Sequence, residues 1–296
     1  MNTIEIKNLT KDYGNNKGVF DVTVEIKPGE VYGYLGPNGA GKSTTMRHLM
    51  GFSKADSGSV KIKGMDCWSE HKEIQKYVGY LPGEIAFPDD MTGTAYLKLI
   101  AKMRKMTDFS YMNELLTIFD INPDAKIKSM SKGMKQKIAI VAAFMHDPEI
   151  ILLDEPTSGL DPLMQQNFIE LVKREKQKGK TIILSSHIFE EVEKTCDRVS
   201  MIRHGKLIKQ FTIEEFKHNT LKTYVISFTN DEQLNEFKKL YPSADMVGNE
   251  IKVGVKETET DSLIKNLAKF NVKYLKEQTL SLEEYFMQFY GGENNA

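Results

Sequence analysis

The sequence has few cysteines, no long hydrophobic run and almost no net charge, and each absence excludes a class of protein. Its 296 residues include two cysteines, too few for a disulfide framework and indicative of a reducing compartment. The apolar run from Ile138 to Met145 has only eight residues, whereas a membrane-spanning helix needs about 18 or more. The net charge of −1 gives no basic surface for nucleic acid. The first residues, Met-Asn-Thr-Ile-Glu-Ile-Lys, do not form a signal peptide. We therefore expect a chain that does not itself cross a membrane.

What the sequence does contain is a glycine-rich segment that reads Gly36-Pro37-Asn38-Gly39-Ala40-Gly41-Lys42-Ser43-Thr44. It fits the phosphate-binding pattern of Gly, four residues, then Gly-Lys-Ser/Thr. Glycines let the backbone fold tightly around phosphate oxygens; Lys42 adds a positive charge, and Ser43 offers a hydroxyl to Mg²⁺. Alone, the pattern also fits a Gly-rich turn before a helix. The apolar run Val31–Leu35 before it, and helical spacing after it, favour a strand–loop–helix nucleotide site.

A second segment places two carboxylates at the end of an aliphatic run. Ile150–Leu153 is typical of a buried parallel strand, and Asp154-Glu155-Pro156 follows it directly. Strand ends of this kind are where α/β sheets bind ligands. We expect Asp154 to hold Mg²⁺ and Glu155 to orient and deprotonate the attacking water. The alternative is the acidic first turn of a helix with proline at its start.

Three further segments have weaker signals. His187 follows the apolar run Thr181–Leu184, so it is expected at the same sheet edge, although a lone histidine is more often structural. Ser131 and Gly133 open an amphipathic helix and form either an anion site or an ordinary helix cap. The segment Ser158-Gly-Leu-Asp161 follows Glu155 closely.

The order and spacing of these segments over residues 1–210 resemble the ATP-binding subunit of a bacterial ABC transporter. The resemblance implies that residues 36–44 are the Walker A loop and that residues 150–155 are Walker B with its catalytic glutamate. It also implies that His187 is the switch histidine and Asp161 the D-loop aspartate. Ser131 and Gly133 match the signature, which in this family closes on ATP held by a second protomer dimerised head to tail.

Tyr13 matches the aromatic residue that stacks on adenine in that family; otherwise it is a surface tyrosine beside a turn. Two positions depart from the family pattern. In the signature, Lys132 replaces the first glycine and Met134 the glutamine. At Leu81-Pro82-Gly83-Glu84, glycine stands where the family has a glutamine that touches Mg²⁺ and water. Glu84 is left open as either a metal ligand or a residue near the membrane partner.

The expected fold class is α/β. Residues 1–211 form a P-loop ABC ATPase domain with a helical subdomain at about 85–146, and residues 212–296 form a small α+β domain. In that second domain, alternating patterns predict a β-α-β-β-α-β order, with strands at 222–228, 250–255 and 272–277 and helices at 231–240 and 261–269. Residues 281–290 predict a last amphipathic helix that docks on its own domain or contacts a second protomer. The residues expected on one face of it are Leu282, Tyr285, Phe286 and Phe289.

The short tail domain resembles the ABC-2-type exporter branch. Taken together, the resemblances of the ATPase domain and of the tail imply ATP hydrolysis with Mg²⁺, a separate transmembrane permease, and a second ATPase protomer that is either a copy or a related chain. They further imply a peripheral place on the cytoplasmic face of the membrane, no nucleic-acid partner, and export of an amphipathic peptide, drug or similar hydrophobic substrate.

Four alternatives follow from the same motifs. The ATPase of an ABC importer has the same ATPase motifs, so only the tail domain favours an exporter over an importer. ABC ATPases that act on ribosomes carry two ATPase units in one chain, whereas one Walker A loop is present here. Repair ATPases separate Walker A from Walker B by a long coiled coil, whereas about 110 residues lie between them here. A P-loop kinase is disfavoured by the Ser131 segment, Asp161 and His187.

Overall fold

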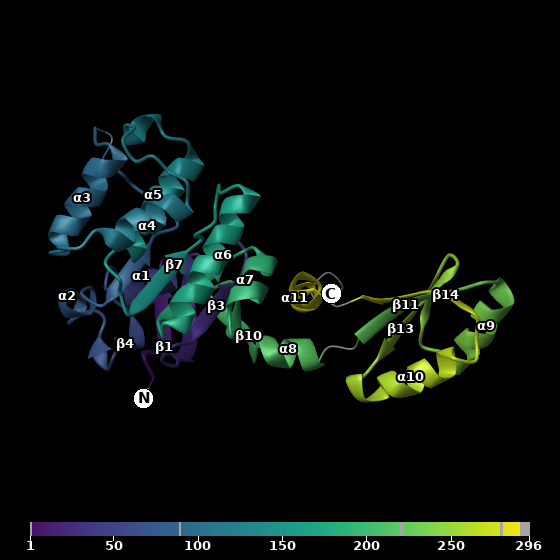
Figure 1. Cartoon of the computed structure of the whole chain (residues 1–296). Coiled ribbons are helices and arrows are strands. Elements are labelled where there is room, and N and C mark those ends of the chain that lie inside the picture. The colour runs from purple at the N-terminus through teal and green to yellow at the C-terminus, as the bar shows by residue number, and fades with distance from the viewer. Residues whose placement is uncertain (1, 89, 220–221, 279–280, 291–296) are drawn as a thin grey trace. The chain divides into compact units, whose positions relative to one another are not determined.

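The computed structural model describes residues 2–88, 90–219, 222–278 and 281–290 (Figure 1). The chain divides into two compact units, residues 1–212 and 213–296. Each unit has its own sheet and its own buried apolar residues, so each is described by itself.

The first unit is built on a six-stranded sheet in the order β10-β9-β3-β8-β7-β6, parallel except for the antiparallel edge strand β10. Its central strands β3, β7 and β8 are short and largely apolar with every residue buried, as expected for parallel strands covered on both faces. The strand bounds are β3 Val31–Leu35, β6 Val78–Leu81, β7 Ile150–Asp154, β8 Thr181–Ser186, β9 Arg198–Arg203 and β10 Lys206–Thr212. Because the five parallel strands point the same way, the loops after β3, β7 and β8 meet at one edge.

A second, antiparallel sheet in this unit has the order β2-β1-β4-β5. Alternate residues such as Ile4, Val24 and Ile62 are buried, so one face of this sheet is apolar. That face shares a core with Tyr32 of β3 and Leu49 of helix α1. The bounds are β1 Ile4–Asp12, β2 Gly18–Ile26, β4 Ser57–Ile62, β5 Met65–Asp66 and α1 Lys42–Leu49.

The helices of the first unit start at recognisable caps. The hydroxyl of Thr92 accepts from the Ala95 N–H at the start of α3, and Asp161 caps α6 with proline in its first turn. Three of the helices, α3 to α5, lie together at one end of the unit (Figure 1). The bounds are α2 His71–Ile74, α3 Gly93–Met103, α4 Ser110–Ile118, α5 Lys132–Phe144, α6 Pro162–Gln177 and α7 Phe189–Thr195.

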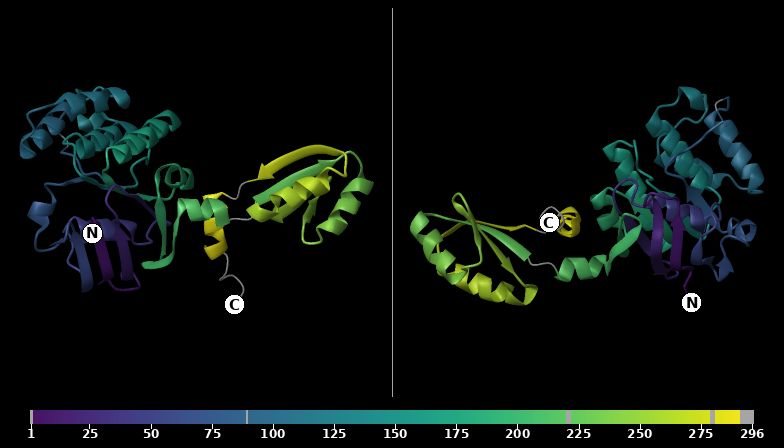
Figure 2. Two further views of the ribbon diagram at one scale, coloured as in Figure 1. Left: turned by 60° about the horizontal axis from the view of Figure 1, so that its bottom comes forward. Right: turned by 180° about the vertical axis from the view of Figure 1, so that it is seen from behind.

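The second unit contains a four-stranded antiparallel sheet in the order β12-β13-β11-β14. The helices α9 and α10 lie on one face of this sheet (Figure 2), and alternate residues of β11 are buried on that side. The rings of Phe228, Phe237 and Phe270 contact one another in this core. The bounds are α8 Ile213–Asn219, β11 Lys222–Phe228, α9 Asp231–Leu240, β12 Asp245–Val247, β13 Glu250–Val255, α10 Thr260–Leu267, β14 Val272–Gln278 and α11 Leu282–Tyr290.

The final helix, α11, buries two of the four residues that the sequence places on one face, Leu282 and Phe286. The ring of Tyr285 lies 5.3 Å, centroid to centroid, from the ring of Phe216 on α8. The side chain of the fourth, Phe289, lies outside the described residues. Tyr285 therefore contacts another helix of its own unit.

The predicted α/β fold class is confirmed, and most elements lie where the sequence places them. The strands β5, β6, β10 and β12 and the helices α2 and α8 were not anticipated. None of the helices that the structure describes is long and apolar enough to cross a membrane.

Candidate active site

The glycine-rich loop joins β3 to α1, in the strand–loop–helix order that the sequence predicts. At Gly36 an added Cβ atom would lie 2.4 Å from the Ile202 carbonyl oxygen, so only glycine fits. Gly39 and Gly41 have φ angles of +80° and +110°, which L side chains rarely adopt. The loop therefore turns tightly and presents the start of α1. The first N–H groups of a helix have no acceptor within it and carry partial positive charge, so this end of α1 attracts anions.

Lys42 is the first residue of α1, and its ammonium group folds back over the loop. Its side chain is 5% exposed. Its Nζ atom donates to the carbonyl oxygens of Gly36 at 2.6 Å and Pro37 at 3.2 Å. It also lies 2.9 Å from Oε1 of Glu155. The loop thus holds a buried cation that contacts two backbone carbonyls and one carboxylate.

Glu155 links this cation to His187. Its Oε2 atom lies 2.5 Å from Nδ1 of His187, whose side chain is half exposed. Because a carboxylate only accepts, Nδ1 carries the proton in this contact. Three side chains from the loops after β3, β7 and β8 therefore meet around one carboxylate, at the sheet edge where the sequence places Glu155 and His187.

The backbone at Glu155 is strained. Its φ angle of +51° lies in the left-handed region, which costs a residue with a side chain about 1–2 kcal/mol. Its N–H donates to the Ser185 carbonyl at 3.0 Å, so β8 helps to fix this conformation. The sharp turn directs the carboxylate toward the glycine-rich loop rather than along the strand.

Asp154, the last residue of β7, is almost completely buried and accepts a hydrogen bond from the Ser185 hydroxyl. Ser43 lies exposed in the first turn of α1. Carboxylate and hydroxyl oxygens are donors that Mg²⁺ takes, usually with water and phosphate oxygens. The described residues contain no group of three or more His, Cys, Asp or Glu side chains able to hold a metal. The donor set fits a Mg²⁺ ion that arrives with phosphates.

Gly83 packs directly against Asp154. An added Cβ atom there would lie 3.0 Å from Oδ2 of Asp154. A side chain at this position would therefore press on the Asp154 carboxylate. The neighbouring Glu84 is exposed, and its role as a metal ligand stays untested.

The signature segment lies against the D-loop of the same chain. The Ser131 hydroxyl caps α5 by accepting from the Met134 N–H at 3.2 Å. Nζ of Lys132 donates to the Ser158 hydroxyl at 2.9 Å. A Cβ atom at Gly133 would lie 2.7 Å from the Gly159 carbonyl oxygen. Lys132 therefore lies along its own D-loop, and glycine at 133 permits the close approach.

Asp161 is also a helix cap in this structure, because its Oδ1 accepts from the Met164 N–H at 3.0 Å. For Ser131 and Asp161 the plain capping interpretation is thus realised within the chain. For each residue, capping accounts for one hydrogen bond of the side chain. Contact of either residue with a second protomer stays a proposal.

Tyr13 lies in the turn between β1 and β2 with its ring 54% exposed. Its hydroxyl lies 3.2 Å from the Ser53 hydroxyl, and the Lys11 ammonium lies 5.7 Å from the ring centroid. The hydroxyl is held by Ser53 while the residue itself is exposed, which suits stacking of the ring on a base. A surface tyrosine that only flanks a turn has the same features.

Sequence reasoning missed Gln136, which is buried on α5. Its Nε2 atom donates to the Pro156 carbonyl at 2.7 Å and to the Glu155 carbonyl at 3.3 Å. It fastens α5 to the loop that carries Glu155. The signal in the sequence was a polar residue on the face of α5 that its apolar residues otherwise form.

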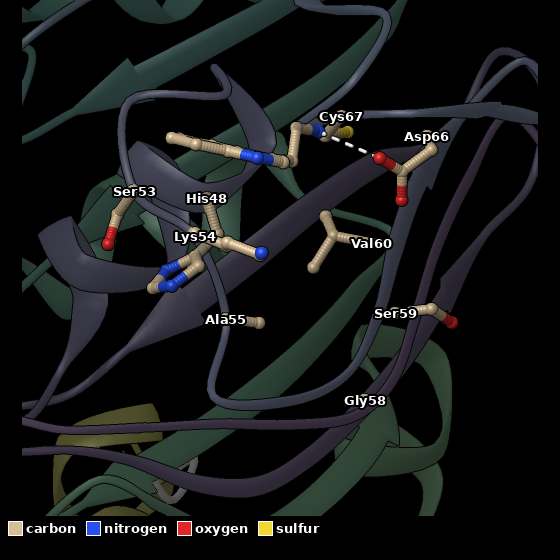
Figure 3. A pocket seen from close by; sticks show the side chains of 10 residues that line it. His48, Ser53, Lys54, Ala55, Gly58, Ser59, Val60, Asp66 and Cys67 are labelled. Atoms are coloured by element: carbon tan, nitrogen blue, oxygen red, sulfur yellow. Dashed lines mark hydrogen bonds between the residues drawn. The ribbon is translucent and has the colours of Figure 1, made fainter.

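A separate cavity of about 170 Å³ lies beyond the other end of α1, next to β4 and β5 (Figure 3). His48, Lys54 and Asp66 line it, and the Asp66 carboxylate accepts from the Trp68 N–H at 3.2 Å. The residues that line it include none of the glycine-rich loop, β7 or β8. It therefore does not belong to the site around Glu155.

Comparison with known proteins gives consistent matches. The family model described as ABC transporter matches residues 19–158. The linearmycin resistance ATP-binding protein LnrL of Bacillus subtilis is 31% identical, over 97% of this chain and 98% of its own length. The bacitracin transport ATP-binding protein BcrA of Bacillus licheniformis is 36% identical, over 74% and 72%. A solved ATP-binding subunit of an ABC transporter superposes with a TM-score of 0.68 at 30% identity, over 73% and 92%.

Proposed function

Because the chain belongs to the ATP-binding proteins of ABC transporters, which hydrolyse ATP, we propose that it powers export through a separate transmembrane permease. One observation carries the catalytic part of the proposal. Lys42, Glu155 and His187 come from three separate loops and meet within hydrogen-bonding distance at one sheet edge.

ATP binding changes the partners of Lys42. The phosphate groups lie on the N–H groups of the loop and of α1, and their oxygens replace the carbonyls and Glu155 around Nζ. Oε1 of Glu155 is then released from its cation and can accept a proton from the attacking water. A positioned general base of this kind contributes about 10²–10⁴ in rate.

Ser43 and Asp154 are the residues that hold Mg²⁺. When bound, the ion neutralises charge on the β- and γ-phosphates. Ser185 keeps the Asp154 carboxylate oriented through its hydroxyl. His187, held by Glu155 through Nδ1, keeps its other ring nitrogen for the γ-phosphate side.

The complete site needs a second protomer. Ser131 and Gly133 begin α5, whose N-terminus favours anions, and this segment lies against residues 158–159 of its own chain. We propose that they close on ATP held by a partner ATPase, either a second copy or a related chain, while Tyr13 stacks on adenine. Closing and reopening of this pair moves the permease.

Export is supported by the relatives rather than by the site. LnrL is named for linearmycin resistance and BcrA for bacitracin transport. We propose an amphipathic peptide, a drug or a similar hydrophobic molecule as cargo, and a peripheral place on the cytoplasmic face of the membrane through the permease. An importer ATPase is the alternative, because importers and exporters use the same kind of ATPase domain.

The test is affinity purification of the tagged full chain from detergent-solubilised native membranes, with mass spectrometry of the proteins that accompany it. We expect a polytopic membrane protein in stoichiometric amount, and its identity narrows the cargo. Recovery of the chain alone, or with ribosomes, would contradict the transport proposal and leave the ATPase in place.

A further inference from the structure

A buried carboxylate lies behind the site and was not anticipated from the sequence. Glu191 belongs to the first turn of α7, and its side chain is only 3% exposed. Its Oε2 atom accepts hydrogen bonds from the Ser186 hydroxyl at 2.7 Å and from the Thr157 hydroxyl at 3.3 Å. Ser186 directly precedes His187, and Thr157 follows Glu155 by two positions. One carboxylate oxygen thus contacts both loops that carry catalytic side chains.

Both donors are built into their loops. The Ser186 hydroxyl also accepts from the Ile188 N–H at 2.9 Å, which closes the backbone around His187. Thr157 is 2% exposed, and its carbonyl accepts from the Leu160 N–H at 3.0 Å. A shift of either hydroxyl therefore moves the backbone beside it.

Stability alone does not account for this arrangement. A glutamate in the first turn of a helix is normally solvated and favours the helix dipole from the surface. Here burial raises the pKa of Glu191 to about 7, and the hydrogen bonds it accepts come from two neutral hydroxyls. Its Oε1 atom is buried without a hydrogen-bond partner among the described residues. Such a carboxylate is costly, whereas an apolar side chain would fill the space without that cost.

We propose that Glu191 is a positioning residue for ATP hydrolysis, which clamps the loop of His187 to the loop of Glu155 through Ser186 and Thr157. Gln136 holds the Glu155 loop from the side of α5, and Glu191 holds it from the side of α7. The inference rests on the proposed role of Glu155 and His187 in turnover.

The test compares kcat and KM for ATP in full-length wild type, Glu191→Ala and Glu191→Gln. We expect Ala to lower kcat about 10- to 100-fold, as small displacements of catalytic groups do, while KM changes little. Gln keeps a carbonyl oxygen that accepts from both hydroxyls, so it restores most of kcat. The exposed neighbour Glu190→Ala is the matched control and should behave as wild type. Wild-type kcat in the Ala variant would overturn the inference, whereas absence of turnover in wild type would overturn the proposed function instead.

If Glu191→Ala does not fold, variants of the two hydrogen-bond donors test the inference instead. Thr157→Val and Ser186→Ala each remove one donor and should lower kcat, and Thr157→Ser should restore it. If Thr157→Val and Ser186→Ala both keep wild-type kcat, the clamp does not exist.

The dependence of kcat on pH distinguishes a positioning role of Glu191 from a purely structural one. The charged and titratable groups around Glu191 are Glu155, which raises its pKa, Cys196, and Glu190 and Lys194, which line the adjacent cavity. Ionised Glu191 accepts hydrogen bonds from Ser186 and Thr157 more strongly than its protonated form, so we expect wild-type kcat to rise with pH through about 7. This step should be absent in Glu191→Gln, and an identical profile in the two proteins would contradict the inference.

Discussion

At the scale of single residues, the central feature is the ion pair between Lys42 and Glu155. Both are largely buried, and their charged atoms lie 2.9 Å apart. Motif spacing predicts each residue singly, because each follows a strand of the same sheet. It does not predict their contact, which depends on the left-handed backbone at Glu155 that directs the carboxylate back toward the loop.

Lys132 shows how a structure resolves a departure from a family pattern. In the sequence, it stands where the family signature has its first glycine. In the structure it lies against Gly159 and donates to Ser158 of its own chain. The sequence held no information on this direction, because the D-loop approaches α5 only in the folded protein.

We expect Lys132→Ala to lower the free energy of unfolding by no more than about 1 kcal/mol, since it removes one exposed hydrogen bond. ATP affinity of the isolated chain should stay within twofold, because the Lys132 side chain lies against Ser158 and Gly159 rather than along loop 36–44. Urea unfolding and nucleotide titration measure both, with Lys128→Ala, exposed in the preceding turn, as the control. A tenfold change in ATP affinity would show that Lys132 acts on its own site.

At the scale of elements, strands with aliphatic runs and helices with caps were predictable. β7 and β8 are continuous apolar runs, and Asp161 followed by proline marks the start of α6. β6 has only four residues, and β10 is largely exposed, so neither has a clear pattern. The burial of Glu191 was also unpredictable, because two glutamates in a first helical turn resemble a solvated face.

The link between α5 and the loop after β7 depends on Gln136. Replacing it by alanine leaves the Pro156 carbonyl without its donor in a buried position, which costs about 1–3 kcal/mol. We expect Gln136→Ala to lose that stability in urea unfolding and to lower kcat for ATP more than it raises KM. Gln166→Ala, an exposed glutamine on α6, is the control. Unchanged kcat in a destabilised Gln136→Ala protein would show that the loop keeps its position without this link.

At the scale of the whole molecule, all proposed site residues belong to the first unit, and the second unit has its own sheet and core. In the second unit, β11, β13, β14, α9 and α10 lie where the sequence places them, whereas the short strand β12 has three exposed residues and no pattern that would reveal it. What a sequence cannot supply is the partner surface, because the signature acts on a nucleotide that another chain holds.

A mixing experiment tests whether the signature acts between chains. Ser131→Arg blocks the signature and Lys42→Ala blocks the loop, so each variant alone should have little turnover. In a head-to-tail dimer of identical chains, the mixture contains pairs with one intact composite site, and we expect turnover to reappear. ATPase assays of the separate and mixed proteins measure this. A mixture no more active than its components would contradict a dimer of identical chains.

The most direct test of the account is steady-state ATP turnover, together with ATP binding, in full-length wild type and Glu155→Gln. The account predicts that Glu155→Gln binds ATP as wild type does and loses turnover by about 10²–10⁴, because the amide cannot accept the proton of the attacking water. Lys42→Ala, in contrast, should weaken ATP binding itself. Equal turnover in Glu155→Gln and wild type would contradict the assignment of Glu155 as the base and with it the mechanism proposed for this site.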